Sequence, residues 1–119
     1  MNERERMRSV LAELLGWEGF GKDGQESEDV YYWRGAMEDG TPFKIYATDW
    51  LPDERWEHAG WVIEAMRAKG WRLELDANTD CVEAVFYLGN DTRGYAALYD
   101  TVPEAVSVAA CCALEATDD

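Results

Sequence analysis

A segment near the end of the chain, residues 102–114, is apolar almost all the way round a helix, and it constrains the fold more than any other feature. A helix without a polar face has to be covered on nearly every side by other elements. Thr101 and Glu104 have the spacing of a capping box, and Pro103 lies in the first turn, where its missing N–H costs nothing. We therefore expect a helix here, at the centre of the core.

Two further helices are indicated by apolar residues at helical spacing. The first is expected over residues 3–15, capped by Asn2 and ended by Gly16. The second is expected over residues 53–69, where Pro52 and Asp53 suit a helix start. Its buried stripe should contain four residues, namely Trp56, Ala59, Ile63 and Met66.

Short runs rich in β-branched and aromatic residues predict the strands. They lie at residues 30–36, 42–47, 71–76, 81–88 and 94–99. The Asp39-Gly40 pair is a strong hairpin-turn signal, and every strand-to-strand connection is short, so the pairing should be antiparallel. We expect one α+β domain over residues 1–119, in the order α-β-β-α-β-β-β-α, with a flexible, acidic, glycine-containing loop at 18–29.

Polar and apolar residues alternate along the expected strands, which is typical of a sheet with one wet face. Eight side chains are candidates for that face, namely Tyr32, Arg34, Lys44, Tyr46, Arg72, Glu74, Glu83 and Tyr87. Such a mixed aromatic and charged face suits a protein partner or a nucleotide-like ligand. The alternative is that it lies beneath a helix.

The charge balance restricts the class of partner. The chain of 119 residues has 25 acidic and 11 basic residues and a net charge of −14. This charge repels nucleic acid and anionic membranes and favours a basic partner. No apolar run approaches the roughly 20 residues that span a bilayer, and the charged start of the chain does not resemble a secretory signal. With three cysteines, an odd number, the sequence favours a reduced, cytoplasmic setting.

Catalytic and metal-binding patterns are sparse. His58 is the only histidine, and Cys111 and Cys112 point about 100° apart on a helix, so we expect no metal and no cofactor. The glycine string at 19–24 follows a helix instead of a strand, which argues against a phosphate-binding loop. Four carboxylates cluster near the second helix, Asp49, Asp53, Glu54 and Glu57, where they complement the helix dipole or, alternatively, hold Mg²⁺ or serve as acid and base.

Trp61 is the aromatic residue that stands apart from the expected core. It lies about 140° from Trp56 on a helical wheel, on the polar face of the second helix. Either another element covers it, such as the 18–29 loop, or it is an exposed anchor of the kind that dominates interfaces. The candidate partner-binding residues are Trp61, Glu57, Glu64, Glu26, Glu28, Asp29, Asp49 and Asp53.

Four stretches of the sequence resemble a known family. They are residues 12–17, 46–49, 61–66 and 100–106, which begin Ala-Glu-Leu-Leu, Tyr-Ala-Thr-Asp, Trp-Val-Ile-Glu and Asp-Thr-Val-Pro. Their order and spacing are similar to those of the phage ABA sandwich domain family. The resemblance implies a three-layer α/β/α sandwich around a mainly antiparallel sheet, and a phage or prophage gene. It implies no activity.

Together these features predict a non-catalytic phage accessory protein acting in the host cytoplasm. It would inhibit a host nucleic-acid-handling or defence protein through an acidic surface. Two alternatives stay open, a sponge for a small nucleotide-like ligand and a small hydrolase that uses the carboxylate cluster.

Overall fold

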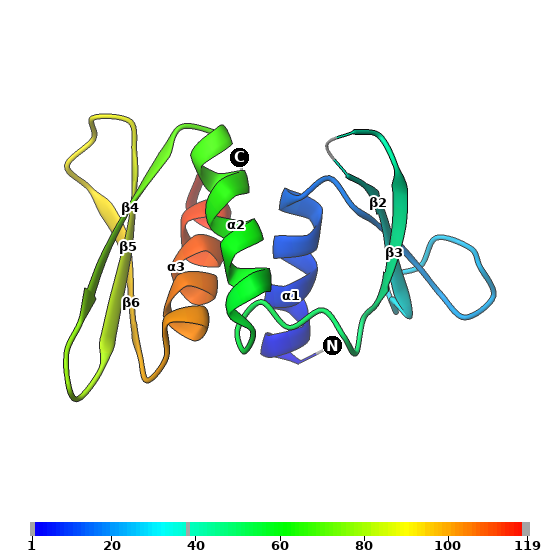
Figure 1. The fold of residues 1–119 in the computed structure, drawn as a ribbon, viewed down its shortest axis with the longest axis horizontal. Coiled ribbons are helices and arrows are strands. Elements are labelled where there is room, and N and C mark those ends of the chain that lie inside the picture. The colour runs from blue at the N-terminus through cyan, green and yellow to red at the C-terminus, as the bar shows by residue number, and fades with distance from the viewer. Residues whose placement is uncertain (1, 38, 118–119) are drawn as a thin grey trace. The chain divides into compact units, whose positions relative to one another are not determined.

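A computed structural model of the protein describes residues 2–37 and 39–117. The chain divides into two compact units, Met1–Leu51 and Pro52–Asp119 (Figure 1). The described residues form three helices and two antiparallel three-stranded sheets, so the predicted α+β class is confirmed. The single domain and the three-layer sandwich stay predictions. No helix in the described ranges is long and apolar enough to cross a membrane.

The first unit contains one helix and one sheet. Its elements are α1 (Glu3–Leu14), β1 (Glu18–Phe20), β2 (Tyr32–Ala36) and β3 (Pro42–Tyr46), with the strands in the order β1-β2-β3. The predicted cap is present, because the Asn2 side chain accepts a hydrogen bond of 2.8 Å from the Glu5 N–H. Gly16, in the left-handed region, then ends α1.

Strand β1 corrects the prediction that the whole of 18–29 is a loop. It pairs with β2, and Gly19 lies opposite Trp33. A Cβ atom at Gly19 would lie 2.6 Å from a methyl group of Val30, so only glycine permits this close approach. The segment 21–31 that follows folds back on β1, since the Tyr31 N–H donates to the Phe20 carbonyl at 2.7 Å. A three-residue strand that contains glycine leaves no alternation for sequence analysis to detect.

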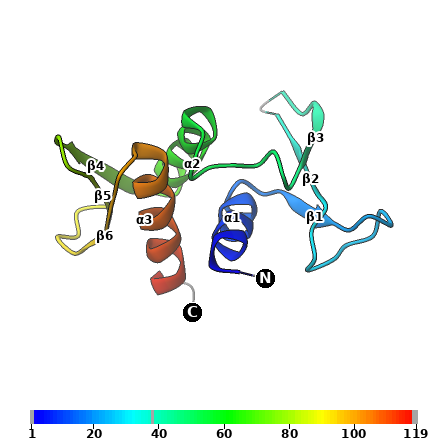
Figure 2. The same cartoon turned by 90° about the horizontal axis from the view of Figure 1, so that it is seen from below.

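The second unit is a helical layer on one sheet. Its elements are α2 (Trp56–Ala68), β4 (Trp71–Ala77), β5 (Val82–Leu88), β6 (Gly94–Tyr99) and α3 (Val102–Thr117). Figures 1 and 2 both show α2 and α3 on the same face of the β4-β5-β6 sheet. The buried residues of β5, Val82, Ala84 and Phe86, alternate with partly exposed ones, as expected for a sheet covered on one face.

Helix α2 differs from the prediction in its start and its buried face. It begins at Trp56, because Arg55 adopts an extended conformation. The buried stripe is Ala59, Val62 and Met66, accompanied by His58 at 3% exposure. Trp56 was predicted to be buried and is 69% exposed, whereas His58, which was left out of the predicted stripe, is buried. Ala59 and Met66 were predicted correctly, so both errors come from a stripe displaced by part of a turn around the helix.

The eight side chains assigned to a wet face divide between the two sheets. Tyr32, Arg34, Lys44 and Tyr46 belong to the first sheet, and none of them is buried. The other four, Arg72, Glu74, Glu83 and Tyr87, lie on β4 and β5 and are exposed or partly exposed. The pattern of alternation is therefore confirmed, but the residues form two surfaces.

Helix α3 is the most buried helix in the described chain, as its sequence predicts, and Val106 is fully buried. We expect Val106→Asp to abolish folding of the second unit, because it would bury an unpaired charge. The control is Cys112→Asp on the same helix, since Cys112 is exposed and its variant should keep native circular dichroism. A Val106→Asp protein with native circular dichroism and an unchanged melting temperature would contradict this assignment.

Ser107 on α3 provides a second stability test. Its side-chain oxygen is buried and has no hydrogen-bond partner. A buried unsatisfied polar group costs about 1–3 kcal/mol, so Ser107→Ala should raise the free energy of unfolding. Urea denaturation measures the change, and a less stable Ser107→Ala protein would show that the hydroxyl has a stabilising partner.

Candidate functional site

Two adjoining hollows on the first unit form the strongest candidate site. One has a volume of about 590 Å³ and is lined by Ser9, Glu13, Trp17, Glu18, Gly19, Glu26, Ser27, Glu28, Val30 and Trp33. The other, of about 660 Å³, shares four of these residues and adds Glu5, Arg8, Asp29, Ala47, Thr48 and Trp50. We call these residues together the acidic groove.

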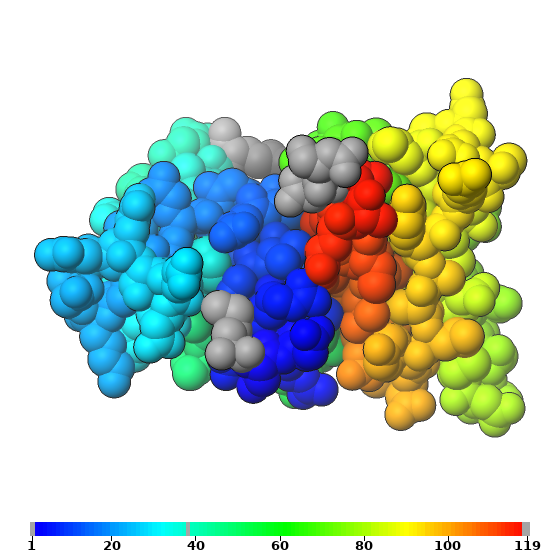
Figure 3. Space-filling view, turned by 180° about the vertical axis from the view of Figure 1, so that it is seen from behind, coloured from blue at the N-terminus to red at the C-terminus, as the bar shows by residue number. Residues whose placement is uncertain are grey.

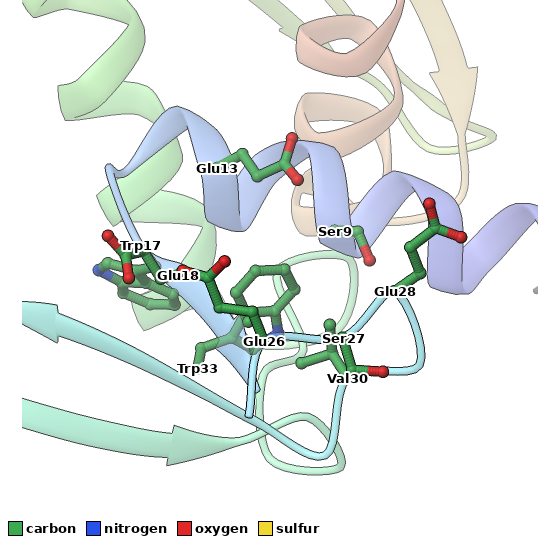
Figure 4. Close-up of a pocket in the computed structure, with 10 residues that line it drawn as sticks. Ser9, Glu13, Trp17, Glu18, Glu26, Ser27, Glu28, Val30 and Trp33 are labelled. Carbon is green, nitrogen blue, oxygen red and sulfur yellow. The ribbon is translucent and has the colours of Figure 1, made fainter. Parts of the chain in front are cut away.

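Helix α1 and the segment after β1 form the walls of the groove. Figure 4 shows Ser9 and Glu13 on α1, with Glu26 and Glu28 on the neighbouring segment. The space-filling view in Figure 3 shows the same segment in cyan beside α1 in blue. The indole of Trp33 is 4% exposed and forms part of the floor.

The end of α1 positions Trp17, which forms part of the floor of the groove. The Trp17 N–H donates to the Ala12 carbonyl at 3.2 Å and the Gly16 N–H to the Glu13 carbonyl at 3.0 Å, which is a Schellman motif. Gly16 has the positive φ of 81° that this motif requires. The chain therefore turns sharply after α1, and Trp17 packs against the sheet.

An aromatic cluster then fixes the indole of Trp17. Its ring centroid lies 5.1 Å from that of Phe43 and 4.7 Å from that of Trp50, both in edge contacts. The Trp50 indole N–H donates to the Arg8 carbonyl on α1 at 2.8 Å. These contacts connect α1 to the sheet and fix the tryptophan floor of the groove, beside which the carboxylates lie.

The charge of the groove is strongly one-sided. Six carboxylates line it, Glu5, Glu13, Glu18, Glu26, Glu28 and Asp29, and Arg8 is its one cation. Its lining includes no histidine or cysteine. Within residues 2–37 and 39–117, no three histidine, cysteine, aspartate or glutamate side chains are grouped so that they could hold a metal ion. The arrangement suits cations of larger size, such as ammonium and guanidinium groups.

The candidate residues chosen from the sequence are distributed over both units. Glu26, Glu28 and Asp29 line the acidic groove, and Asp49 is exposed in the turn after β3. Asp53 belongs to the second unit and is only 4% exposed, contrary to the expectation of a surface acid. The carboxylate cluster is divided in the same way, because Glu54 and Glu57 also belong to the second unit.

Trp61 is 37% exposed on α2, and its ring lies 4.9 Å from that of His58. The two acids expected beside it are paired on the same helical surface. The Glu57 carboxylate lies 3.9 Å from the Arg55 guanidinium, and the Glu64 carboxylate lies 3.1 Å from the Arg67 guanidinium. Trp61 is therefore an exposed aromatic residue, but the charge around it is partly neutralised.

Several groove residues were missed by sequence analysis. Glu18 was assigned to a loop, and Glu13, Trp17 and Trp33 were not singled out. The signal that was available is the Gly16-Trp17 pair, because a Schellman glycine followed by a large apolar residue predicts where that residue packs.

Comparison with protein-family models, curated proteins and solved structures finds no match to this chain. The resemblance to the phage ABA sandwich family therefore stays a prediction.

Gly35 offers a direct test of the groove floor. A Cβ atom at this position would lie 2.6 Å from the Trp17 indole nitrogen and would displace the ring. Overpacking of this kind costs about 1–3 kcal/mol, so Gly35→Ala should lower the free energy of unfolding and change the near-ultraviolet circular dichroism.

The matched control is Gly60→Ala within α2, where a Cβ atom would meet nothing within 4 Å. This change should raise stability by up to about 1 kcal/mol, since alanine is the better helix former. If Gly35→Ala were as stable as Gly60→Ala, the indole would not be fixed as described.

Proposed function

We propose that this chain is a non-catalytic binding protein that takes lysine and arginine side chains of a basic partner protein into the acidic groove. The observation that supports the proposal is the lining of the groove, with six carboxylates and one guanidinium above a tryptophan floor. A net charge of −14 adds a long-range field that speeds the approach of such a partner.

Lysine and arginine suit this groove because each has an apolar stem and a charged head. The stem can lie against Trp17 and Trp33, while the head reaches the carboxylates of the walls. Indole rings also attract cations through their π-electron faces. The combination gives both the electrostatic attraction and the desolvated contact that a stable interface needs.

The biological setting follows from the family resemblance and is part of the same proposal. A phage or prophage protein of this kind would have the three-layer fold of the family. It would act in the host cytoplasm. Proteins that handle nucleic acid present basic grooves, so an acidic surface can occupy them as a competitor. The alternative of nucleotide sequestration is supported by a different surface, the outer face of the β1-β2-β3 sheet.

An oligo-arginine peptide is the probe that tests the groove. Glu26→Gln combined with Glu28→Gln should weaken its binding about tenfold in calorimetry, because two charge-assisted contacts are lost. The control removes the same charge elsewhere through Asp76→Asn and Asp80→Asn, both exposed on the second unit. Equal weakening by the two double variants would mean that only the overall charge attracts the peptide, and the groove assignment would then be wrong.

A second test follows once a basic partner is captured from host lysate. It measures the association rate at several salt concentrations and the dissociation rate of tryptophan variants. The association rate should fall steeply as salt rises, since the Debye length is about 8 Å at physiological ionic strength. Trp61→Ala tests the candidate anchor on the second unit separately from the groove: it should raise the dissociation rate, while Trp56→Ala, which removes a more exposed ring of the same size on the same helix, should not. If the two variants changed the rate equally, Trp61 would not be the anchor.

A further inference from the structure

The outer face of the β1-β2-β3 sheet carries two adjacent rows of side chains. The register places Phe20, Tyr32 and Tyr46 in one row across the three strands. It places Glu18, Arg34 and Lys44 in the next row. An aromatic row therefore lies beside a charged row. Four of these six residues are among the eight predicted for the wet face, and Phe20 and Glu18 are not.

The charged row is electrostatically unfavourable as it stands. Arg34 and Lys44 lie directly opposite each other on β2 and β3, and like charges in this position destabilise a sheet. Glu18 lies opposite Arg34 on β1. Within the described part of the chain, however, no ion pair involves either cation. In a chain with 25 acidic and 11 basic residues, two unneutralised facing cations indicate a place for an anion.

The aromatic row provides flat apolar surfaces next to these cations. The rings of Phe20 and Tyr32 are stacked, with centroids 5.4 Å apart and planes at 14°. The Lys44 ammonium lies 4.4 Å from the Tyr32 ring centroid and 5.0 Å from that of Tyr46. Tyr32, Arg34 and Lys44, together with Pro42 and Phe43, line a hollow of about 430 Å³, which is within the usual size of small-ligand sites.

We propose that this face binds a small phosphorylated ligand with an aromatic base, that is, a free nucleotide. The base stacks on the exposed ring of Tyr46, and the phosphate lies between Arg34 and Lys44, where it relieves their repulsion. A nucleic acid polymer is disfavoured, because its many phosphates would meet the field of a protein with a net charge of −14. The Asp and Glu side chains of an acidic peptide would use the cations but carry no aromatic ring that stacks on a tyrosine.

The test titrates the full-length protein with ATP and follows the amide resonances of β2 and β3 by NMR. Binding should shift them at millimolar or lower ATP. Arg34→Gln and Lys44→Gln should each weaken binding about tenfold, and they should keep or raise the melting temperature because the like-charge pair is removed. Arg93→Gln, an exposed arginine of the second unit, is the matched control and should leave the affinity unchanged.

Three further probes separate the ligand classes. Tripolyphosphate should bind at least about tenfold more weakly than ATP, and Tyr46→Leu should weaken ATP about tenfold without changing tripolyphosphate, because stacking requires the base. The proposal is overturned if ATP shifts no resonance of β2 or β3, or if tripolyphosphate binds as tightly as ATP. Tighter binding of oligothymidylate or oligoglutamate than of ATP would overturn it in favour of a nucleic acid or an acidic protein.

Discussion

The contact between the Trp17 indole and the backbone of Gly35 is the constraint on which the first unit depends. A side chain of any size at Gly35 would occupy the place of the ring, so Trp17 can take this position only because residue 35 is glycine. The Schellman turn at Gly16 delivers Trp17 to this position, and Phe43 and Trp50 hold it there by edge contacts. Because Trp50 also bonds to the Arg8 carbonyl, the aromatic cluster ties α1 to the strands, and the groove exists as a consequence.

The sheet of this unit carries its two cations on one face and borders most of the groove carboxylates on the other, with Glu18 at the start of β1 in register with the cations and also lining the groove. Side chains alternate along a strand, so Trp33 faces inward toward the groove while its neighbours Tyr32 and Arg34 face outward. The inward side is bordered by carboxylates from α1 and the segment after β1, and the outward side carries Arg34 and Lys44 among aromatic rings. The net charge of −14 is therefore unevenly distributed, with one surface suited to cations and another suited to an anion. A shift of one residue in the register would exchange the two faces.

Sequence patterns located most of the elements, for reasons that differ between them. Helix α3 was found because a nearly continuous apolar surface has no stable alternative to burial, and the five longer strands were found from composition, alternation and turn residues. Strand β1 was missed because three residues containing Gly19 carry no alternation. The buried face of α2 was misplaced because Trp56 is apolar yet lies at the first turn of the helix, where little packs on it. Hydrophobicity alone does not distinguish such a position from the core.

The sequence by itself determined the α+β class, the acidic charge, and the helix caps at Asn2 and Thr101. These features depend on local spacing and composition, which a sequence states directly. Only the tertiary structure decided that Glu13 on α1 and Glu26 after β1 line one groove, and that Arg34 faces Lys44 across two strands. Those groupings depend on strand register and on the close approach at Gly19 and Gly35, which arise from packing between residues distant in the chain.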